Sequence, residues 1–153
     1  MSNIESRLAE MGITLPEATA PAANYIPFVQ VGDMLYVSGQ ISMKDGEMIK
    51  GKVGDALTVD EGAAAAKTCA ISLLAQVKAA CGGDLSRLKR VVKLTGFVNS
   101  TPDFGDQPKV VNGASDFLVE VLGDAGRHSR SAVSAGSLPF GVAVEIEGIF
   151  QIA

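Results

Sequence analysis

Apolar side chains alternate with other residues along the last stretch of the chain, over 142–152. One side of this stretch is apolar and the other is mostly polar: Val142, Val144, Ile146, Phe150 and Ile152 against Ala143, Glu145, Glu147 and Gln151. A period of two places successive side chains on opposite faces of a β-strand. The pattern therefore predicts a strand with one face against a hydrophobic layer, and such a strand needs a sheet to join.

Other extended segments supply the partners for that strand. Apolar, β-prone runs predict strands within 28–40, over 88–99 and over 131–135. Asp45-Gly46 is a hairpin dipeptide, because both of its positions tolerate positive φ, and Glu47 to Lys50 is the predicted return strand. These segments together predict a sheet of about six strands.

Three segments carry apolar residues at helical spacing, over 3–11, 59–82 and 109–122. The first two open with the spacing of a capping box, at Ser2–Glu5 and at Thr58–Glu61. The order of strands and helices predicts an α+β sandwich, with a mixed sheet and two main helices packed on one of its faces.

Two features of this arrangement predict close contacts. The four consecutive alanines at 63–66 would let another backbone approach the second helix. Two helices cover one side of the sheet only, and an uncovered apolar face in a small protein marks a subunit interface. We therefore expect a homo-oligomer.

The charge balance argues against two classes of partner. The chain has 13 Lys and Arg against 17 Asp and Glu, a net charge of −4. Binding to nucleic acid or to an anionic membrane needs a surplus of basic residues, so neither partner is expected.

Cysteine and histidine are too scarce for a metal centre. The chain has 2 Cys and 1 His. Cys69 and Cys81 fall on one predicted helix, about 18 Å apart at the rise of an α-helix, so they cannot pair with each other. We expect no metal, no cofactor and no disulfide, and two reduced thiols are typical of a cytoplasmic protein.

The N-terminal segment is treated as an extension. Glu5, Arg7 and Glu10 interrupt its apolar residues, which is unlike a signal peptide, and no window reaches the roughly 20 apolar residues of a membrane span. We expect an N-terminal extension with a short helix over 1–19, followed by one α+β domain over 20–153.

Two charged residues on predicted strands are candidates for chemistry. Arg130 opens an apolar strand, where a guanidinium either extends to solvent or clamps a carboxylate or phosphate. Glu145 lies on the less apolar side of the last strand, where it either solvates that face or orients water. An arginine partner would lower the pKa of Glu145 and weaken it as a base. The sequence leaves these alternatives open.

Other polar residues carry less information. His128 stands without a second histidine or a nucleophile motif, so a structural role is favoured. Ser38-Gly39-Gln40 ends a buried strand, and Gly39 would let a ligand approach the backbone.

Taken together, the segments resemble the RidA/YjgF family, also described as the liver perchloric-acid-soluble protein family. The resemblance spans about residues 20–152 and is carried by an ordered set of pieces: Ala20-Pro21-Ala22-Ala23, Ser38-Gly39-Gln40-Ile41, Phe97-Val98, Asp103-Phe104, Val111-Asn112, Arg130-Ser131-Ala132-Val133, Leu138-Pro139 and Val144-Glu145-Ile146-Glu147. It implies a chorismate-mutase-like fold and trimers with ligand clefts between subunits.

The resemblance also implies a reaction. Members of the family hydrolyse reactive 2-imino or 2-enamino acids to 2-keto acids and ammonia without a metal. By position, Arg130 would hold the substrate carboxylate and Glu145 would position the attacking water. Ser38 and Gly39 would line the cleft from the neighbouring subunit. An imine is already electrophilic, so orientation and a positioned water are the main requirements.

The chain departs from the family pattern at several places. Ala132 stands where a cysteine is common, and Phe28 stands at the cleft tyrosine, for which Tyr25 is near enough to substitute. The extension over 1–19 and an extra segment at 105–109 suggest a divergent branch of longer members.

Two other functions remain as alternatives. The first is a non-catalytic trimer that binds small carboxylates or keto acids in the same cleft. The second is an endoribonuclease, a label attached to some members, which the net charge of −4 and the single histidine disfavour.

Overall fold

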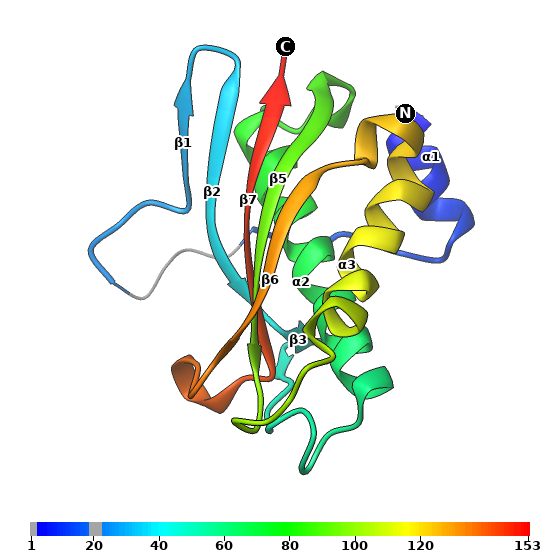
Figure 1. The fold of residues 1–153 in the computed structure, drawn as a ribbon. Helices are drawn as coiled ribbons and strands as arrows, with labels where there is room; N and C mark the ends of the chain where they lie inside the picture. The colour runs from blue at the N-terminus through cyan, green and yellow to red at the C-terminus, as the bar shows by residue number, and fades with distance from the viewer. Residues whose placement is uncertain (1–2, 19–22) are drawn as a thin grey trace.

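The computed structural model describes residues 3–18 and 23–153 and forms a helical layer against one β-sheet (Figure 1). The elements follow the chain as α1 (Asn3–Glu10), β1 (Phe28–Val31), β2 (Met34–Ile41), β3 (Met43–Lys44), β4 (Glu47–Met48), α2 (Val59–Ala80), the 3-10 turn η1 (Leu85–Arg87), β5 (Leu88–Asn99), α3 (Gln107–Leu122), η2 (Gly123–Gly126), β6 (Ser129–Ala135), η3 (Pro139–Gly141) and β7 (Val144–Ile152). The α+β class with a mixed sheet and two main helices on one face is confirmed.

The main sheet has five strands in the order β1-β2-β7-β5-β6. Neighbours are antiparallel except β5 and β6, which are parallel and are joined by α3 as a crossover. The expected count of about six strands was too high for this sheet, because β3 and β4 form a separate two-stranded hairpin. Its turn is Asp45-Gly46, as predicted, with positive φ at both residues.

Several element boundaries differ from the prediction. The return strand β4 ends at Met48, and Lys50 instead makes an isolated bridge to Val142. The third helix starts at Gln107, two residues early, so it includes part of the 105–109 segment. The sixth strand starts at Ser129, which places Arg130 inside the strand and not at its opening. The capping-box residue Ser2 and the matching piece at 20–22 lie outside the described residues.

The core between sheet and helices is aliphatic. The alternation predicted over 142–152 holds within β7, where Val144, Ile146, Phe150 and Ile152 are buried against the helices. It fails before β7 begins, since Ala143, expected on the mostly polar side, is buried like Val142. The capping box of α2 is present: Thr58 Oγ1 accepts from the Glu61 amide at 3.1 Å, and Glu61 Oε1 accepts from the Thr58 amide at 3.1 Å.

The two main helices touch at an alanine and a glycine. A Cβ on Gly113 of α3 would overlap the carbonyl oxygen of Ala63 in α2. Ala63 belongs to the run of four alanines, so the expected close approach of another backbone to this run is confirmed.

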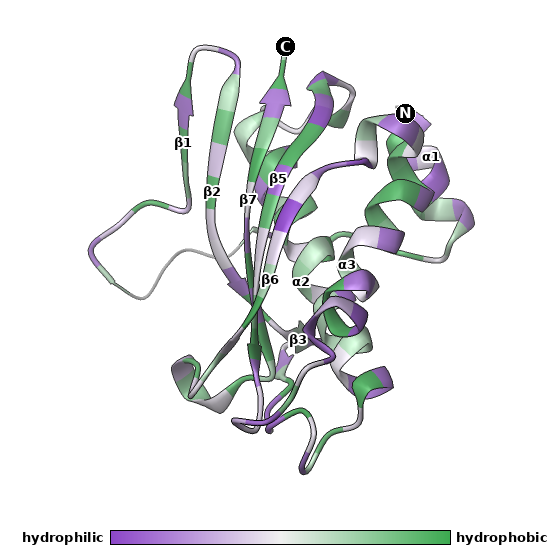
Figure 2. Cartoon of the chain, in the orientation of Figure 1, coloured by the Kyte–Doolittle hydropathy of each residue, from purple (hydrophilic) through white to green (hydrophobic). Residues whose placement is uncertain are grey.

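The other face of the sheet is not covered by the described helices (Figure 1). Val29 and Tyr36 are paired across β1 and β2 on this face, and each side chain is 46% exposed. Val133 of β6 also lies on it and is 43% exposed. Hydrophobic residues recur along the strands as well as along the helices (Figure 2). We call the side of the sheet that the described helices leave uncovered the open face.

The segment before β1 begins with α1, which packs on other helical elements and not in the sheet. Helix α1 packs on α3 and on η1, with Leu8 buried. None of the described helices has both the length and the apolar character that crossing a bilayer requires.

Candidate functional site

Ser38 and Gly39 form a β-bulge in strand β2. The pairing with β7 shifts between Val37, which lies opposite Gly148, and Gln40, which lies opposite Ile146. Two residues of β2 therefore stand against Glu147 alone. A bulge bends its strand and re-aims side chains, and it is common beside functional sites.

Glu145 fills the space above this bulge. A Cβ on Gly39 would overlap the Glu145 carboxyl group, so the carboxylate lies directly against the glycine backbone. The sequence predicted a close approach at Gly39 by a ligand, and within one chain the approaching group is Glu145. These two residues are the part of the expected site that one chain assembles by itself.

The surroundings of Glu145 make it a stronger base than an ordinary carboxylate. Partial burial raises the pKa of Glu145, and the negative charge of Glu147 raises it further. No arginine accounts for a contribution, so the alternative in which an arginine lowers this pKa does not describe the single chain. A carboxylate with a raised pKa is suited to accepting a proton from water.

Ser38 ties the bulge to the segment before β1. Its amide donates to the Pro27 carbonyl at 2.9 Å, and its hydroxyl donates to the Ile26 carbonyl at 3.1 Å. Tyr25 precedes these residues and its side chain is 52% exposed. Phe28 pairs with Val37 and packs against the core, so it belongs to the helix side of the sheet.

Arg130 lies on the other face of the sheet from Glu145. It pairs with Leu94, whose side chain is buried against the helices, and its own guanidinium reaches α3. Nη1 donates to Ser115 Oγ at 2.9 Å, and Nη2 donates to the Pro108 carbonyl at 3.1 Å. Pro108 belongs to the 105–109 segment, so this segment contributes a partner to the candidate arginine.

The register also separates Arg130 from Glu145 along the strands. Glu145 and Val133 both pair with Phe97 of β5, so Val133 is the residue of β6 that lies level with Glu145. Arg130 is three positions before Val133 and points to the opposite face. A single chain therefore does not bring the two candidate residues into one cavity.

His128 and Ser115 extend the contacts of Arg130. His128 Nε2 lies 2.9 Å from Ser115 Oγ, and Nδ1 lies 2.6 Å from the Gly126 carbonyl oxygen. Ser115 was missed by the sequence analysis. Its signal was a polar residue four positions after Val111, on a helix face that otherwise supplies the core.

The thiols are not placed for catalysis. Cys69 is fully buried and 3.5 Å from the Val144 carbonyl, and burial raises its pKa far above the ordinary value. Cys81 lies one residue past α2, and burial raises its pKa as well. Both are free, and a protonated thiol is a poor nucleophile. Among the described residues, no group of three or more His, Cys, Asp or Glu is placed to hold a metal ion.

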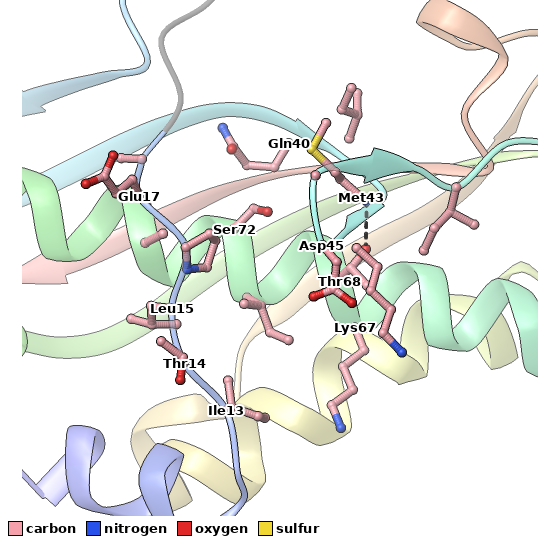
Figure 3. A pocket seen from close by; sticks show the side chains of 18 of the residues that line it. Ile13, Thr14, Leu15, Glu17, Gln40, Met43, Asp45, Lys67, Thr68 and Ser72 are labelled. Atoms are coloured by element: carbon pink, nitrogen blue, oxygen red, sulfur yellow. Dashed lines mark hydrogen bonds between the residues drawn. The ribbon is translucent and has the colours of Figure 1, made fainter.

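A separate groove of about 940 Å³ runs between α2, the hairpin and the 12–18 segment (Figure 3). Ile13 and Leu15 lie alongside α2, and the Met43 amide donates to Thr68 Oγ1 at 3.1 Å. Neither Arg130 nor Glu145 lines this groove. It was not predicted, because a space between a non-helical segment and a helix leaves no periodic pattern in the sequence.

A family model described as "YjgF/chorismate_mutase-like, putative endoribonuclease" matches residues 5–146. A relative from Trypanosoma cruzi, "Protein TCP17", is 48% identical over 97% of this chain and 94% of its own. A "2-iminobutanoate/2-iminopropanoate deaminase" from Dermatophagoides farinae is 29% identical over 92% of this chain and 94% of its own.

Solved structures separate near from distant relatives. A protein of unknown function from Agrobacterium tumefaciens is 51% identical, with a TM-score of 0.92 over 99% of this chain and 93% of its own. The YjgF gene product of E. coli is 30% identical, with a TM-score of 0.64 over 88% of this chain and 93% of its own. The chain therefore groups with the Agrobacterium protein, in a branch distinct from that of the E. coli protein.

Proposed function

The chain belongs to the YjgF/RidA/L-PSP family, and we propose that it hydrolyses reactive 2-imino or 2-enamino acids to 2-keto acids and ammonia. The observation that carries the proposal is the carboxylate of Glu145, held against Gly39 with a raised pKa. The name of the 29% identical relative from Dermatophagoides farinae supports the same substrate class. The proposed site needs no metal or cofactor.

The residues have separate roles in this reaction. Arg130 binds the substrate carboxylate through N–H groups that Ser115 and Pro108 leave available. Glu145 takes a proton from the attacking water as the water oxygen bonds to the imine carbon, and it passes that proton to the imine nitrogen. The resulting carbinolamine gives its hydroxyl proton through Glu145 to the nitrogen as the C–N bond breaks, so ammonia leaves and the keto acid remains. Ser38 and Gly39 line the space beside Glu145, and Tyr25 lies in the adjoining segment. Phe28 belongs to the helix side of the sheet and lies away from this space.

We propose that the cleft is completed by neighbouring copies in a homotrimer. Arg130 and Glu145 lie on opposite faces of one sheet, so a cavity that contains both requires residues from a second chain. The exposed apolar residues of the open face supply a surface for such packing.

Product release from a freshly generated 2-aminoacrylate-type imine tests the activity. Glu145→Gln should lower kcat by about 10²- to 10⁴-fold, the range of a lost general base. Arg130→Ala should raise KM by about 10- to 100-fold, as expected for the loss of a charged hydrogen bond. Arg127→Ala removes an exposed arginine three positions away and should leave both constants unchanged. Equal rates for the wild type and both site variants would refute the assignment.

The placement of Arg130 also favours a second function, binding of small carboxylates without turnover. Its guanidinium faces α3 and not Glu145, so a carboxylate can be held without meeting a base. This function predicts saturable binding of a 2-keto acid that Arg130→Ala abolishes, with no ammonia released from any imine. Ammonia release that depends on Glu145 would exclude it.

A further inference from the structure

The hydrogen bonds around His128 have one consistent direction. The Gly126 carbonyl can only accept, so Nδ1 of His128 carries the hydrogen of that 2.6 Å bond. In a neutral imidazole Nε2 is then an acceptor, and it receives the hydroxyl hydrogen of Ser115. The lone pairs of Ser115 Oγ are left for Nη1 of Arg130, which can only donate. Arg130, Ser115 and His128 therefore form one directed chain of hydrogen bonds that ends on the backbone.

The chain of hydrogen bonds is anchored at both ends. Gly126 packs closely on α3, because a Cβ there would overlap the Leu118 carbonyl of that helix. Ser115 is on the same helix, and Pro108 at its start holds Nη2 of Arg130. The helix α3 thus holds the guanidinium through Ser115 and Pro108. The contact through Ser115 depends on His128 Nε2 as the acceptor of the Ser115 hydroxyl.

Protonation of His128 changes this arrangement. The Nε2 atom becomes a donor, so Ser115 loses the acceptor of its hydrogen and Oγ faces two donors, one from each cation. The imidazolium also repels the guanidinium. Both effects weaken the hold of α3 on Arg130, and a carboxylate bound to Arg130 relieves the repulsion.

We propose that Ser115 and His128 are positioning residues for Arg130, and that carboxylate binding at Arg130 and proton binding at His128 favour each other. The inference rests on the proposed role of Arg130 as the carboxylate-binding group. By linkage, each event must strengthen the other by the same factor. The site then binds carboxylates more tightly as the pH falls through the titration of His128.

The electrostatics agree with this geometry. Burial lowers the pKa of His128, the Gly126 hydrogen bond opposes this, and the charge of Arg130 lowers it further. The other charged groups on the elements around His128 are all exposed: Asp124 and Arg127 at η2, Lys89, Arg90 and Lys93 on β5, and Lys109, Asp116 and Glu120 on α3. Arg127 is paired with Asp124 at 3.4 Å, and Arg90 donates to the Arg127 carbonyl. None of these groups is among the causes of the shift.

His128 is the only histidine in the sequence, so the imidazole resonances belong to it and no further variants are needed to assign them. The first experiment measures the pKa of His128 by NMR in the full chain without ligand. Arg130→Ala should raise this pKa, and Arg130→Lys, which keeps the charge, should raise it less. Ser115→Ala removes the hydroxyl and should give a pKa of His128 that differs from that of the wild type. Ser115→Thr keeps the hydroxyl and should give the wild-type pKa. Arg127→Ala is the control and should leave it unchanged. A pKa that is the same in the wild type and in Arg130→Ala would overturn the inference.

The second experiment adds pyruvate, a small 2-keto acid that is not turned over. Saturating pyruvate should raise the pKa of His128, and a rise of one unit corresponds to about 10-fold tighter binding to the protonated form. The dissociation constant for pyruvate should decrease as the pH is lowered in the wild type. In His128→Gln it should not depend on pH over the same range. Binding that depends on Arg130 while the pKa of His128 does not move would overturn the inference alone. Binding that ignores Arg130→Ala would overturn both the inference and the proposed role of Arg130.

Discussion

The carboxyl group of Glu145 occupies the space that a side chain on Gly39 would need. This contact joins two strands at a bulge in which two residues of β2 face one of β7. Because glycine has no Cβ, the backbone and the carboxylate can touch, and the partly buried carboxylate then has a raised pKa.

Gly39→Ala tests this contact directly. The added methyl group overlaps Glu145 Oε2 and crowds Cδ and Cγ, so the carboxylate must move away from the bulge. We expect kcat for imine hydrolysis to fall by at least about 10-fold, because a general base has to stay within hydrogen-bond reach of the water. Gly105→Ala is the matched control, since a Cβ there meets nothing within 4 Å. Full activity in Gly39→Ala would separate Glu145 from the reaction.

The pH dependence of kcat should follow the ionisation of Glu145. The base must be ionised to accept a proton, and burial, together with repulsion from Glu147, raises the pKa of Glu145 above its ordinary value of 4.5. We therefore expect kcat to rise with pH through a midpoint above 4.5. In Glu147→Gln the midpoint should move to lower pH, because one cause of the raised pKa is removed. An acid limb with the same midpoint in Glu145→Gln would assign the titration to another group.

The pKa shifts of Glu145 and His128 have opposite effects on how folding stability depends on pH. The raised pKa of Glu145 means that its contribution is present below pH 4.5 and is lost as the pH rises through its folded-state pKa. The lowered pKa of His128 gives a contribution that is present above pH 6.5 and is lost as the pH falls through its folded-state pKa. Urea unfolding of His128→Gln should show a smaller loss of stability below pH 6.5 than the wild type. An identical pH dependence in the two proteins would contradict this assignment.

Gly113→Ala should destabilise the fold more than an ordinary glycine replacement. Its methyl group would overlap the Ala63 carbonyl in a contact between two helix backbones, neither of which can move as a side chain can. Overpacking of this kind costs about 1–3 kcal/mol, and a backbone contact places the expected loss at the upper end. Asn112→Ala changes the exposed neighbour on α3 and should alter the free energy of unfolding by less than about 0.5 kcal/mol. Urea denaturation of both variants measures the difference.

The sequence predicted the parts of the fold that repeat with a period. Within β7 the alternation assigned residues 144–147 and 150–152 to their faces, and the Thr58–Glu61 box marked the start of α2. Glycine at position 39 indicated a close approach, but a single residue does not say which group approaches. The bulge at Ser38 decides that, and it arises from the pairing of two strands that are distant in the sequence.

The surroundings of Arg130 were beyond prediction for a similar reason. The side of β6 on which its side chain lies depends on a parallel register with β5, in which Leu94 is its partner. Its contacts with Ser115 and Pro108 depend on α3 starting at Gln107, within a segment that the pattern treated as an insertion. Each of these features is set by packing between elements and leaves no local signal.

A charge placed on the open face should dissociate the proposed homotrimer. Tyr36 of β2 is 46% exposed in a single chain and lies beside Val29, in the apolar part of that face. Packing against a neighbouring copy would bury this position, and an unpaired lysine there costs several kcal/mol, so Tyr36→Lys should shift the assembly toward monomers. Ala79→Lys adds the same charge at an exposed position of α2 and should leave the mass unchanged. Light scattering after size exclusion distinguishes a trimer from the 15.8 kDa single chain. A wild-type protein that already elutes as a monomer would remove the shared cleft, because Arg130 and Glu145 would then have no second chain to bring them together.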